Sequence, residues 1–290
     1  MIPNIFHFVF GLKKQTEEFH IVYYLALKSC LNIHKPEKIN FYYKYEPYGP
    51  YWDKIKKSLN LIPVEPPTEI FGIPITHYAH QADIIRLQAL IEEGGVYADI
   101  DSIFLREFPK EFYEKDFVMG QQGNEGLCNA LMMSSKGSLF ARKWLSDHSI
   151  CFKGGAPGTD GWCTHSVYHP LQLSKEMPDD IHIAGPKAFF GFLYHQQELH
   201  HLFKVQTPPG FSPTFMEFDY KSFHLWENVS WDDYLKDLTE EKIFTENNLY
   251  NCMARYHIDP SDEDWYVNPL DNEPGMNAGS IDESGNYTEF

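Results

Sequence analysis

The fold is decided by residues 79–101, which read AHQADIIRLQALIEEGGVYADID. Apolar side chains recur at helical spacing over the first fifteen of these residues, and Gly94 follows where a helix end favours a residue that tolerates positive φ. Residues 96–98 then enter a strand that leads directly into Asp99 and Asp101. This order places both carboxylates at the carboxyl end of a strand, where open α/β sheets bind ligands.

Strands and helices alternate along the first half of the chain. Short apolar or alternating runs predict strands at residues 5–10, 38–45, 61–64, 96–98, 116–119 and 130–133. Helical spacing predicts helices over residues 22–36, 52–59 and 139–147. This alternation favours an α/β fold with a mostly parallel central sheet flanked by helices. Residues 153–161 are glycine-rich and predict a flexible loop, and after Pro157 we expect long irregular loops over one face.

The composition is that of a folded protein with one acidic end. Of the 290 residues, 43% are hydrophobic, and no run approaches the ~18 apolar residues of a membrane span. The net charge is −17, and nine of the acids lie in residues 256–290, which contain no Lys or Arg. This acidic excess argues against nucleic-acid binding. We therefore predict one domain over residues 1–258 and an extended or partly disordered tail over residues 259–290.

The cysteines and the amino terminus favour a reducing compartment. The five cysteines are scattered and none forms a CxxC pair, which argues against a disulfide framework or a zinc ribbon. Residues 1–10 lack the basic start and long apolar run of a signal peptide, and they predict a core strand instead. We expect a cytoplasmic protein, of a bacterium or encoded by a virus.

The two acids after the predicted strand suggest a cation site. Asp99 and Asp101 are two residues apart, so in a regular strand their side chains point to the same face. Such a pair needs protons or a cation, and Mg²⁺ or Mn²⁺ with a bound diphosphate would satisfy it. The alternative is a solvated turn, where Asp-x-Asp is common. On the preceding helix, Asp83 and Arg86 form either a local ion pair or a site for sugar hydroxyls and phosphate oxygens.

Residues 80–101 resemble the core motif of the DXD-containing sugar-transferase family, with Ala-Asp-x-x-Arg followed by Gly-Gly-x-Tyr-x-Asp-x-Asp. That family includes fungal initiating α-1,6-mannosyltransferases, bacterial capsule and lipooligosaccharide sugar transferases and, more distantly, the glucosylating domain of clostridial toxins. Residues 2–11 are similar to its opening strand, with Phe10 at a position where Trp is usual. Residues 224–231 are similar to its closing His and Ser-Trp element, so the resemblance covers about residues 1–231.

This resemblance implies a GT-A fold, with the irregular loops on the acceptor side. It implies retaining transfer of a sugar from a nucleoside-diphosphate donor to a glycan or other hydroxyl acceptor. A UDP-hexose is the first expected donor and GDP-mannose the second, with Mn²⁺ or Mg²⁺ as the cofactor. Asp101 would bind the metal directly, Asp99 would contact the ribose and the metal shell, and His224 would be a later metal ligand. Asp83 would hold sugar hydroxyls with Arg86 beside it.

The resemblance also implies donor contacts from several parts of the chain. Val9 and Phe10 would lie near the base. The other expected donor-binding residues are Gln81, Asp83, Arg86, Tyr97, Asp99, Ser230 and Trp231, the last two at the diphosphate. The expected catalytic residues are Asp83, Arg86, Asp99 and Asp101. On the acceptor side we expect Asn129, and also Asp160 and Trp162 of the glycine-rich loop.

Two other classes of function stay open. His195, His200 and His201 suggest a metal-dependent hydrolase, although their spacing is not the HExxH pattern. The second alternative is a GT-A-like carbohydrate- or partner-binding protein without catalysis. The sequence does not specify the donor sugar, the acceptor, the linkage, the oligomeric state or the role of the tail.

Overall fold

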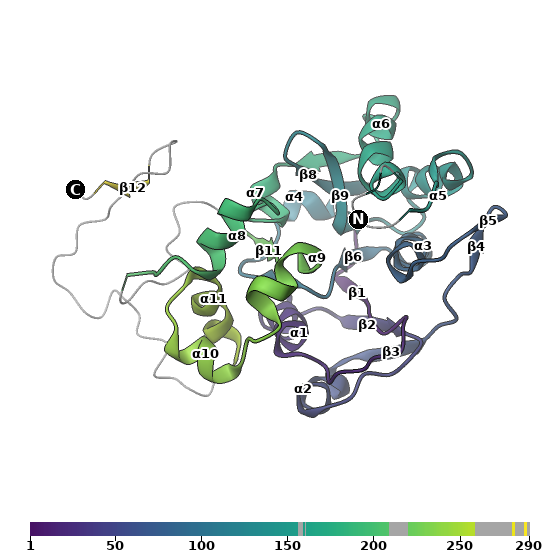
Figure 1. Ribbon diagram of the computed structural model, residues 1–290. Helices are drawn as coiled ribbons and strands as arrows, with labels where there is room; N and C mark the ends of the chain where they lie inside the picture. The colour runs from purple at the N-terminus through teal and green to yellow at the C-terminus, as the bar shows by residue number, and fades with distance from the viewer. Residues whose placement is uncertain (156–158, 160, 209–219, 259–279, 282–286, 289–290) are drawn as a thin grey trace. The chain divides into compact units, whose positions relative to one another are not determined.

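The computed structural model describes residues 1–155, 159, 161–208, 220–258, 280–281 and 287–288. In this described part of the chain, seven strands form one sheet in the order β10, β8, β9, β6, β1, β2, β3 (Figure 1). They are β1 (Ile5–Val9), β2 (Lys38–Tyr43), β3 (Asn60–Pro63), β6 (Gly95–Ala98), β8 (Phe117–Gln122), β9 (Gly126–Ser134) and β10 (His182–Ala184). All run in one direction except β9, which is antiparallel to both neighbours. The predicted α/β class with a mostly parallel sheet is confirmed.

The strand order reverses between β1 and β6. Strands β2 and β3 follow β1 on one side, whereas β6 pairs with β1 on the other side, with Phe6 opposite Val96 and His7 opposite Tyr97. Open α/β sheets bind ligands at the carboxyl ends of strands where the order reverses in this way. The acids that follow β6 therefore lie at the position where this architecture binds ligands.

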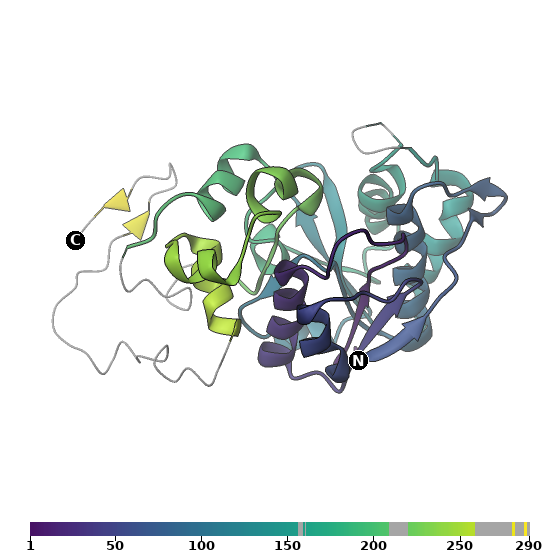
Figure 2. The same cartoon turned by 60° about the horizontal axis from the view of Figure 1, so that its bottom comes forward.

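Helices cover both faces of the sheet (Figure 1, Figure 2). On one face, α1 (Ile21–His34), α2 (Pro50–Ile55) and α11 (Leu249–Ile258) share a buried cluster with alternate residues of the strands. On the other face, α3 (Tyr78–Glu93), α5 (Leu139–Cys151) and α6 (His169–Glu176) share a second cluster. Along β6, Val96 and Ala98 belong to the first cluster and Tyr97 to the second, because strand side chains alternate between faces.

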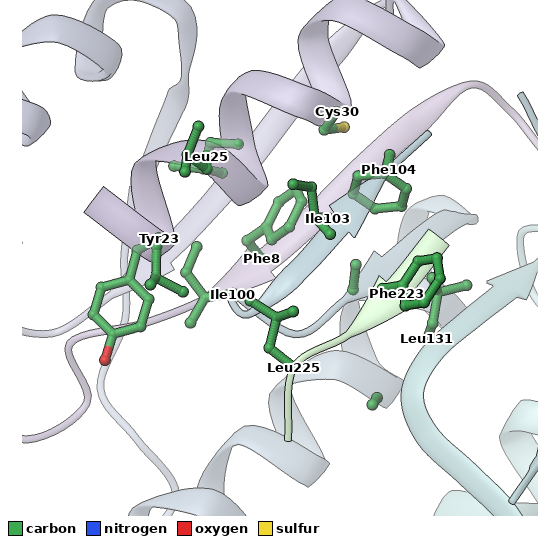
Figure 3. Packing of buried hydrophobic residues seen from close by; sticks show 14 of the residues in the cluster. Phe8, Tyr23, Leu25, Cys30, Ile100, Ile103, Phe104, Leu131, Phe223 and Leu225 are labelled. Carbon is green, nitrogen blue, oxygen red and sulfur yellow. The ribbon is translucent and has the colours of Figure 1, made fainter. Parts of the chain in front are cut away.

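Residues of the first cluster place β11, a strand from the second half of the chain, beside the end of β6. Figure 3 shows Phe8 of β1 with Leu25 of α1, near Phe104 of β7 (Ser102–Phe104). Strand β11 (Ser222–His224) pairs antiparallel with β7, so that His224 lies opposite Ser102. A segment far along the chain is thereby placed next to the turn that follows β6.

Two consecutive glycines connect the end of α3 to the start of β6. Gly94 and Gly95 have positive φ, 75° and 115°, and the Gly94 N–H donates to the carbonyl of Leu90 at 2.9 Å. A Cβ on Gly95 would collide with the carbonyl oxygen of Ile5 in the neighbouring strand. The predicted end of the helix at Gly94 is confirmed. The double glycine lets β6 start close against β1 and so fixes where α3 lies relative to the turn with the two acids.

The expectation of long loops after Pro157 was wrong for the described residues. Besides α6, α11, β10 and β11, this part contains the π-helices η2 (Thr164–Tyr168) and η4 (Trp231–Leu235) and the helices α7 (Pro186–Phe189), α8 (Gln196–Phe203), α9 (Glu227–Ser230) and α10 (Glu240–Thr245). In α8, Leu199, Leu202 and Phe203 form the buried face. Most of these helices have only one or two turns, which is too short for apolar periodicity to reveal them.

The remaining elements among the described residues of 1–258 are the 3₁₀ helix η1 (Lys56–Ser58), β4 (Glu69–Ile70), β5 (Ile73–Pro74) and α4 (Lys110–Tyr113). The chain divides into two units, Met1–Ile258 and Asp259–Phe290. In the second unit the structure describes β12 (Ser280–Ile281) paired with β13 (Tyr287–Thr288), and the rest of the predicted acidic tail lies outside the described residues. Among the described helices, none combines the length and apolar content that crossing a bilayer requires.

Candidate active site

Asp99 and Asp101 lie in a turn that follows β6. The strand ends at Ala98, and the N–H of Ser102 donates to the carbonyl of Asp99 at 3.0 Å. The prediction that regular strand geometry points both side chains to one face was therefore wrong. The solvated turn is also excluded, because Asp101 is only 4% exposed. The carboxylates converge for a different reason, which is that both face the same histidine.

That histidine is His224, the last residue of β11. Its Nε2 lies 3.1 Å from Oδ1 of Asp101 and 3.9 Å from Oδ2 of Asp99. The other oxygen of Asp101 accepts a hydrogen bond of 2.9 Å from the backbone N–H of Glu227. One possible ligand atom from each of Asp99, Asp101 and His224 lies within 4.8 Å of the other two. The structure thus brings together the three residues that were predicted as metal ligands.

The chemistry of this group fits a divalent cation. Carboxylates suit Mg²⁺ and Mn²⁺, and the added imidazole favours the transition metal. Burial alone would lower the pKa of His224, but the carboxylates of Asp101 and Asp99 outweigh burial and raise it. Burial raises the pKa of Asp99 against the opposing effects of Arg86 and His224. For Asp101, His224 and the Glu227 N–H outweigh burial and lower the pKa. The buried negative charge is therefore only partly compensated by the protein itself.

Arg86 of α3 contacts both Asp83 on the same helix and Asp99 in the turn after β6. Its Nη2 lies 3.2 Å from Oδ1 of Asp99 and 3.5 Å from Oδ1 of Asp83. Its guanidinium carbon lies 4.3 Å from the centre of the Tyr97 ring, and the Tyr97 hydroxyl donates to Oδ1 of Asp99 at 2.6 Å. The predicted pair of Asp83 and Arg86 therefore exists, and the same guanidinium also compensates Asp99. Arg86 is 5% exposed, so this bridge is part of the protein interior.

Asp83 is surrounded by hydrogen-bond donors, including two histidines that were not predicted. Its Oδ2 lies 2.8 Å from Nε2 of His165 and 3.4 Å from Nδ1 of His80, and its Oδ1 accepts a 2.7 Å hydrogen bond from the side-chain amide of Asn129. Burial alone would raise the pKa of Asp83, but Arg86 and the two histidines hold it well below its usual range. His80 precedes Asp83 by three residues on the helix, so its position was a usable signal. His165 has no local signal.

Phe10 and Trp231 form an aromatic group with Tyr23, a residue that was not predicted. The ring centroids of Phe10 and Trp231 lie 4.8 Å and 5.9 Å from that of Tyr23, and the Trp231 ring is stacked on it. The Tyr23 hydroxyl donates to Oε1 of Glu227 at 2.8 Å. Burial and the nearby Asp101 carboxylate raise the pKa of Glu227 to about 7, against the hydrogen bond from Tyr23. Through Glu227, this aromatic group is connected to the turn with the two acids.

Three other predicted donor-binding residues face the protein interior or its backbone. Val9 is buried in the second core cluster. The amide of Gln81 is half-buried and donates to the carbonyl of Pro67 at 3.1 Å. The buried hydroxyl of Ser230 donates to the carbonyl of Leu225 at 2.6 Å. Ser230 thus stabilises the chain reversal after β11 in this structure, and its predicted contact with a diphosphate stays a prediction.

The remaining predictions concern the other histidines and the glycine-rich loop. Among the described residues, two groups of side chains could hold a metal ion, and His195, His200 and His201 belong to neither. The hydrolase alternative therefore has no geometric support in this part of the chain. Asp160 lies outside the described residues. The second of these groups is His80, Asp83 and His165, and the Trp162 ring packs 4.8 Å from the ring of His80.

Comparison with known proteins shows similarity to one family. Residues 12–119 match the family described as a glycosyltransferase sugar-binding region containing a DXD motif. Glucan organizing enzyme 1 of Cryptococcus neoformans is 34% identical over 288 residues, covering 92% of this chain and 73% of that protein. Subversion of eukaryotic traffic protein A of Legionella pneumophila is 29% identical over 126 residues, covering 41% of this chain and 18% of that protein. The structure of apo-form glycosyltransferase GlyE of Streptococcus pneumoniae is 11% identical, covers 92% of this chain and 64% of that chain, and has a TM-score of 0.49.

Proposed function

Because the chain belongs to the glycosyltransferases whose sugar-binding region contains a DXD motif, we propose that it transfers a hexose from a nucleoside-diphosphate sugar to a hydroxyl acceptor. The family confirms the resemblance predicted from residues 80–101. A UDP-hexose is the proposed donor, with GDP-mannose second, and a glycan is the proposed acceptor. The observation that supports this proposal most directly is the convergence of Asp99, Asp101 and His224 after β6. The cytoplasmic location stays a prediction.

The proposed cofactor is Mn²⁺, with Mg²⁺ as the second choice. Asp101 and His224 would bind it directly, and Asp99 would complete the shell. When bound, the cation supplies positive charge that stabilises a departing diphosphate. The chain holds the ligands in place, because the Glu227 N–H fixes one oxygen of Asp101 and Arg86 fixes one oxygen of Asp99.

We propose that the transfer retains the anomeric configuration. The acceptor hydroxyl would attack the face from which the diphosphate leaves, and a diphosphate oxygen would take its proton, so that no nucleophile from the enzyme is required. Asp83 and Arg86 are the proposed contacts to the donor sugar. Phe10, whose ring packs on Tyr23 near the end of β1, is the proposed contact to the base, and Trp231, which stacks on the same tyrosine, is the proposed contact to the diphosphate.

A screen of UDP- and GDP-sugars with and without Mn²⁺ tests the proposal. The readouts are donor hydrolysis, transfer to added glycans and the thermal unfolding midpoint. A nucleotide sugar at about 100 times its dissociation constant should raise the midpoint by about 5 to 10 °C in the presence of Mn²⁺. Adding a chelator should remove both the shift and the turnover.

Asp101→Asn provides the decisive variant, and Asp53→Asn is its matched control. Asp53 is an exposed acid on α2 with an ion pair to Lys56, so its amide variant should behave like the wild type. Asp101→Asn should lose Mn²⁺-dependent turnover and most of the thermal shift. Equal stabilisation of both variants by Mn²⁺ and nucleotide would contradict the metal assignment. Binding of nucleotide sugar by the wild type without any turnover would instead favour the non-catalytic alternative.

A further inference from the structure

Oδ2 of Asp83, the carboxylate oxygen that Arg86 and Asn129 do not contact, faces a buried histidine from the second half of the chain. His165 lies in η2 and has no exposed surface. Its Nε2 is 2.8 Å from Oδ2 of Asp83. An ionised carboxylate can only accept hydrogen bonds, so Nε2 must carry the proton. Among the described residues, Nδ1 of His165 has no hydrogen-bond partner. Among the described residues, the side chain of His165 therefore hydrogen-bonds to Asp83 alone.

The fold holds His165 in this position from several sides. The indole N–H of Trp144 donates to the carbonyl of His165 at 2.8 Å, which fixes the backbone of η2. The Phe152 ring packs 4.9 Å from the imidazole. A Cβ on Gly126 of β9 would lie 2.6 Å from atoms of Val167, so the glycine is what allows η2 to approach the sheet this closely. A π-helix is a rare local geometry that occurs frequently at functional sites.

Asp83 in turn contacts two further side chains, Asn129 of β9 and Arg86 of α3. Its Oδ1 accepts from the Asn129 side-chain amide at 2.7 Å and lies 3.5 Å from Arg86, and Arg86 in turn lies 3.2 Å from Asp99. Because the amide nitrogen of Asn129 faces Asp83, its side-chain oxygen is left for another partner. A shift of the Asp83 carboxylate would therefore move both the guanidinium that compensates Asp99 and the amide of Asn129.

We propose that His165 is a positioning residue for glycosyl transfer, which fixes Asp83 so that Arg86 is correctly placed against the donor sugar and Asn129 on the acceptor side. This inference rests on the proposed function. Packing alone does not account for an imidazole at this position, because an apolar side chain would leave Oδ2 of Asp83 with only the 3.4 Å contact to Nδ1 of His80.

The test compares two substitutions of His165 in the full chain. His165→Leu removes the donor at similar volume and should lower kcat for transfer by about 10- to 100-fold, because small misplacements near a reacting centre have effects of that size. His165→Gln keeps an N–H within reach of Asp83 and should recover most of the loss. The KM for the donor and the Mn²⁺-dependent thermal shift should change by less than about threefold and a few degrees, since the metal ligands are untouched.

His148→Leu is the control for packing. His148 is equally buried and its ring lies 5.4 Å from that of His165, but its hydrogen bond of 2.9 Å joins Nδ1 to the carbonyl of Trp144, not to Asp83. This variant should keep kcat near that of the wild type. Equal losses in the two Leu variants, or no recovery with Gln, would overturn the positioning role.

A second readout does not depend on turnover. A long-range ¹H–¹⁵N spectrum of the wild type should show a proton on Nε2 of His165, and its absence would overturn the proposal. Stoichiometric zinc in the purified protein that is lost in His165→Leu would also overturn it, because Nε2 would then be a metal ligand. A wild type that turns over no nucleotide sugar would refute the proposed function instead, and that result is seen without any variant.

Discussion

Acid should destabilise this protein through His34, a histidine buried at the end of α1. His34 is 6% exposed, and its ring lies 4.8, 5.0 and 4.6 Å from those of Phe6, Phe104 and Phe108. Among the described residues, its Nε2 has no hydrogen-bond partner. Burial in this aromatic setting lowers the pKa of His34 from 6.5 to about 3. The folded protein therefore keeps this imidazole neutral at a pH where the unfolded chain already protonates it.

The sign and size of the effect follow from this difference. Because the folded pKa lies below the unfolded value, the contribution of His34 is complete above pH 6.5 and is lost as the pH falls toward the folded pKa. Between pH 7 and pH 5 the loss in the free energy of unfolding amounts to about 2 kcal/mol for an unfolded pKa near 6.5. If the folded pKa of His34 were one unit higher, the loss of stability would change by less than about 0.1 kcal/mol, because pH 5 would still lie above the folded pKa.

The assay is urea unfolding of the wild type and His34→Phe at pH 7 and pH 5. Phenylalanine suits the aromatic surroundings and cannot be protonated, so the variant should lose about 2 kcal/mol less than the wild type on acidification. Groups with other pKa shifts are common to both proteins and cancel in the comparison. His200→Gln, at an exposed position of α8, should retain the pH dependence of the wild type. If His34→Phe loses as much stability as the wild type, the imidazole is already solvated or protonated in the folded protein and the reasoning is refuted.

Three further substitutions probe the site and its support. Arg86→Lys should lower kcat by about tenfold or more in steady-state assays without altering the circular dichroism spectrum, because one ammonium cannot reproduce the bridge between two carboxylates. Gly95→Ala should cost more than about 2 kcal/mol in urea unfolding, because φ is 115° and the new Cβ meets the carbonyl of Ile5. Ser29→Ala should cost about 1 to 3 kcal/mol in the same assay, because it removes the buried hydroxyl that accepts from the Phe104 N–H at 3.0 Å.

The first half of the fold could be predicted because its signals are local. Strand β1 was expected at residues 5–10 and is Ile5–Val9, and the helix expected over residues 79–93 is Tyr78–Glu93. Apolar runs, helical spacing and the double glycine each act within a few residues of the chain. Strand β11 was missed because it has only three residues and exists through its pairing with β7. A strand of that length has no periodicity to detect.

The part of the site that could be predicted is the part with local sequence signals. Asp99 and Asp101 belong to a continuous motif, but the assumed strand geometry was wrong and a turn presents them to His224 instead. His165 was missed because its contact with Asp83 spans 82 residues and depends on the position of η2 against β9. Sequence patterns thus identified the acids and Arg86, and the family resemblance identified His224, whereas the contact of His165 with Asp83 comes from long-range packing.

The charge balance of the site explains why a cation is the expected partner. Asp83, Asp99 and Asp101 are three buried or half-buried carboxylates, and Arg86 is shared between two of them. The carboxylates of Asp101 and Asp99 raise the pKa of His224, so they favour its protonated form. A divalent cation that binds His224 must displace the proton from the coordinating nitrogen, so metal binding should release protons and weaken as the pH falls. A bound divalent cation would add two positive charges beside these carboxylates, which is the compensation that an incoming diphosphate requires.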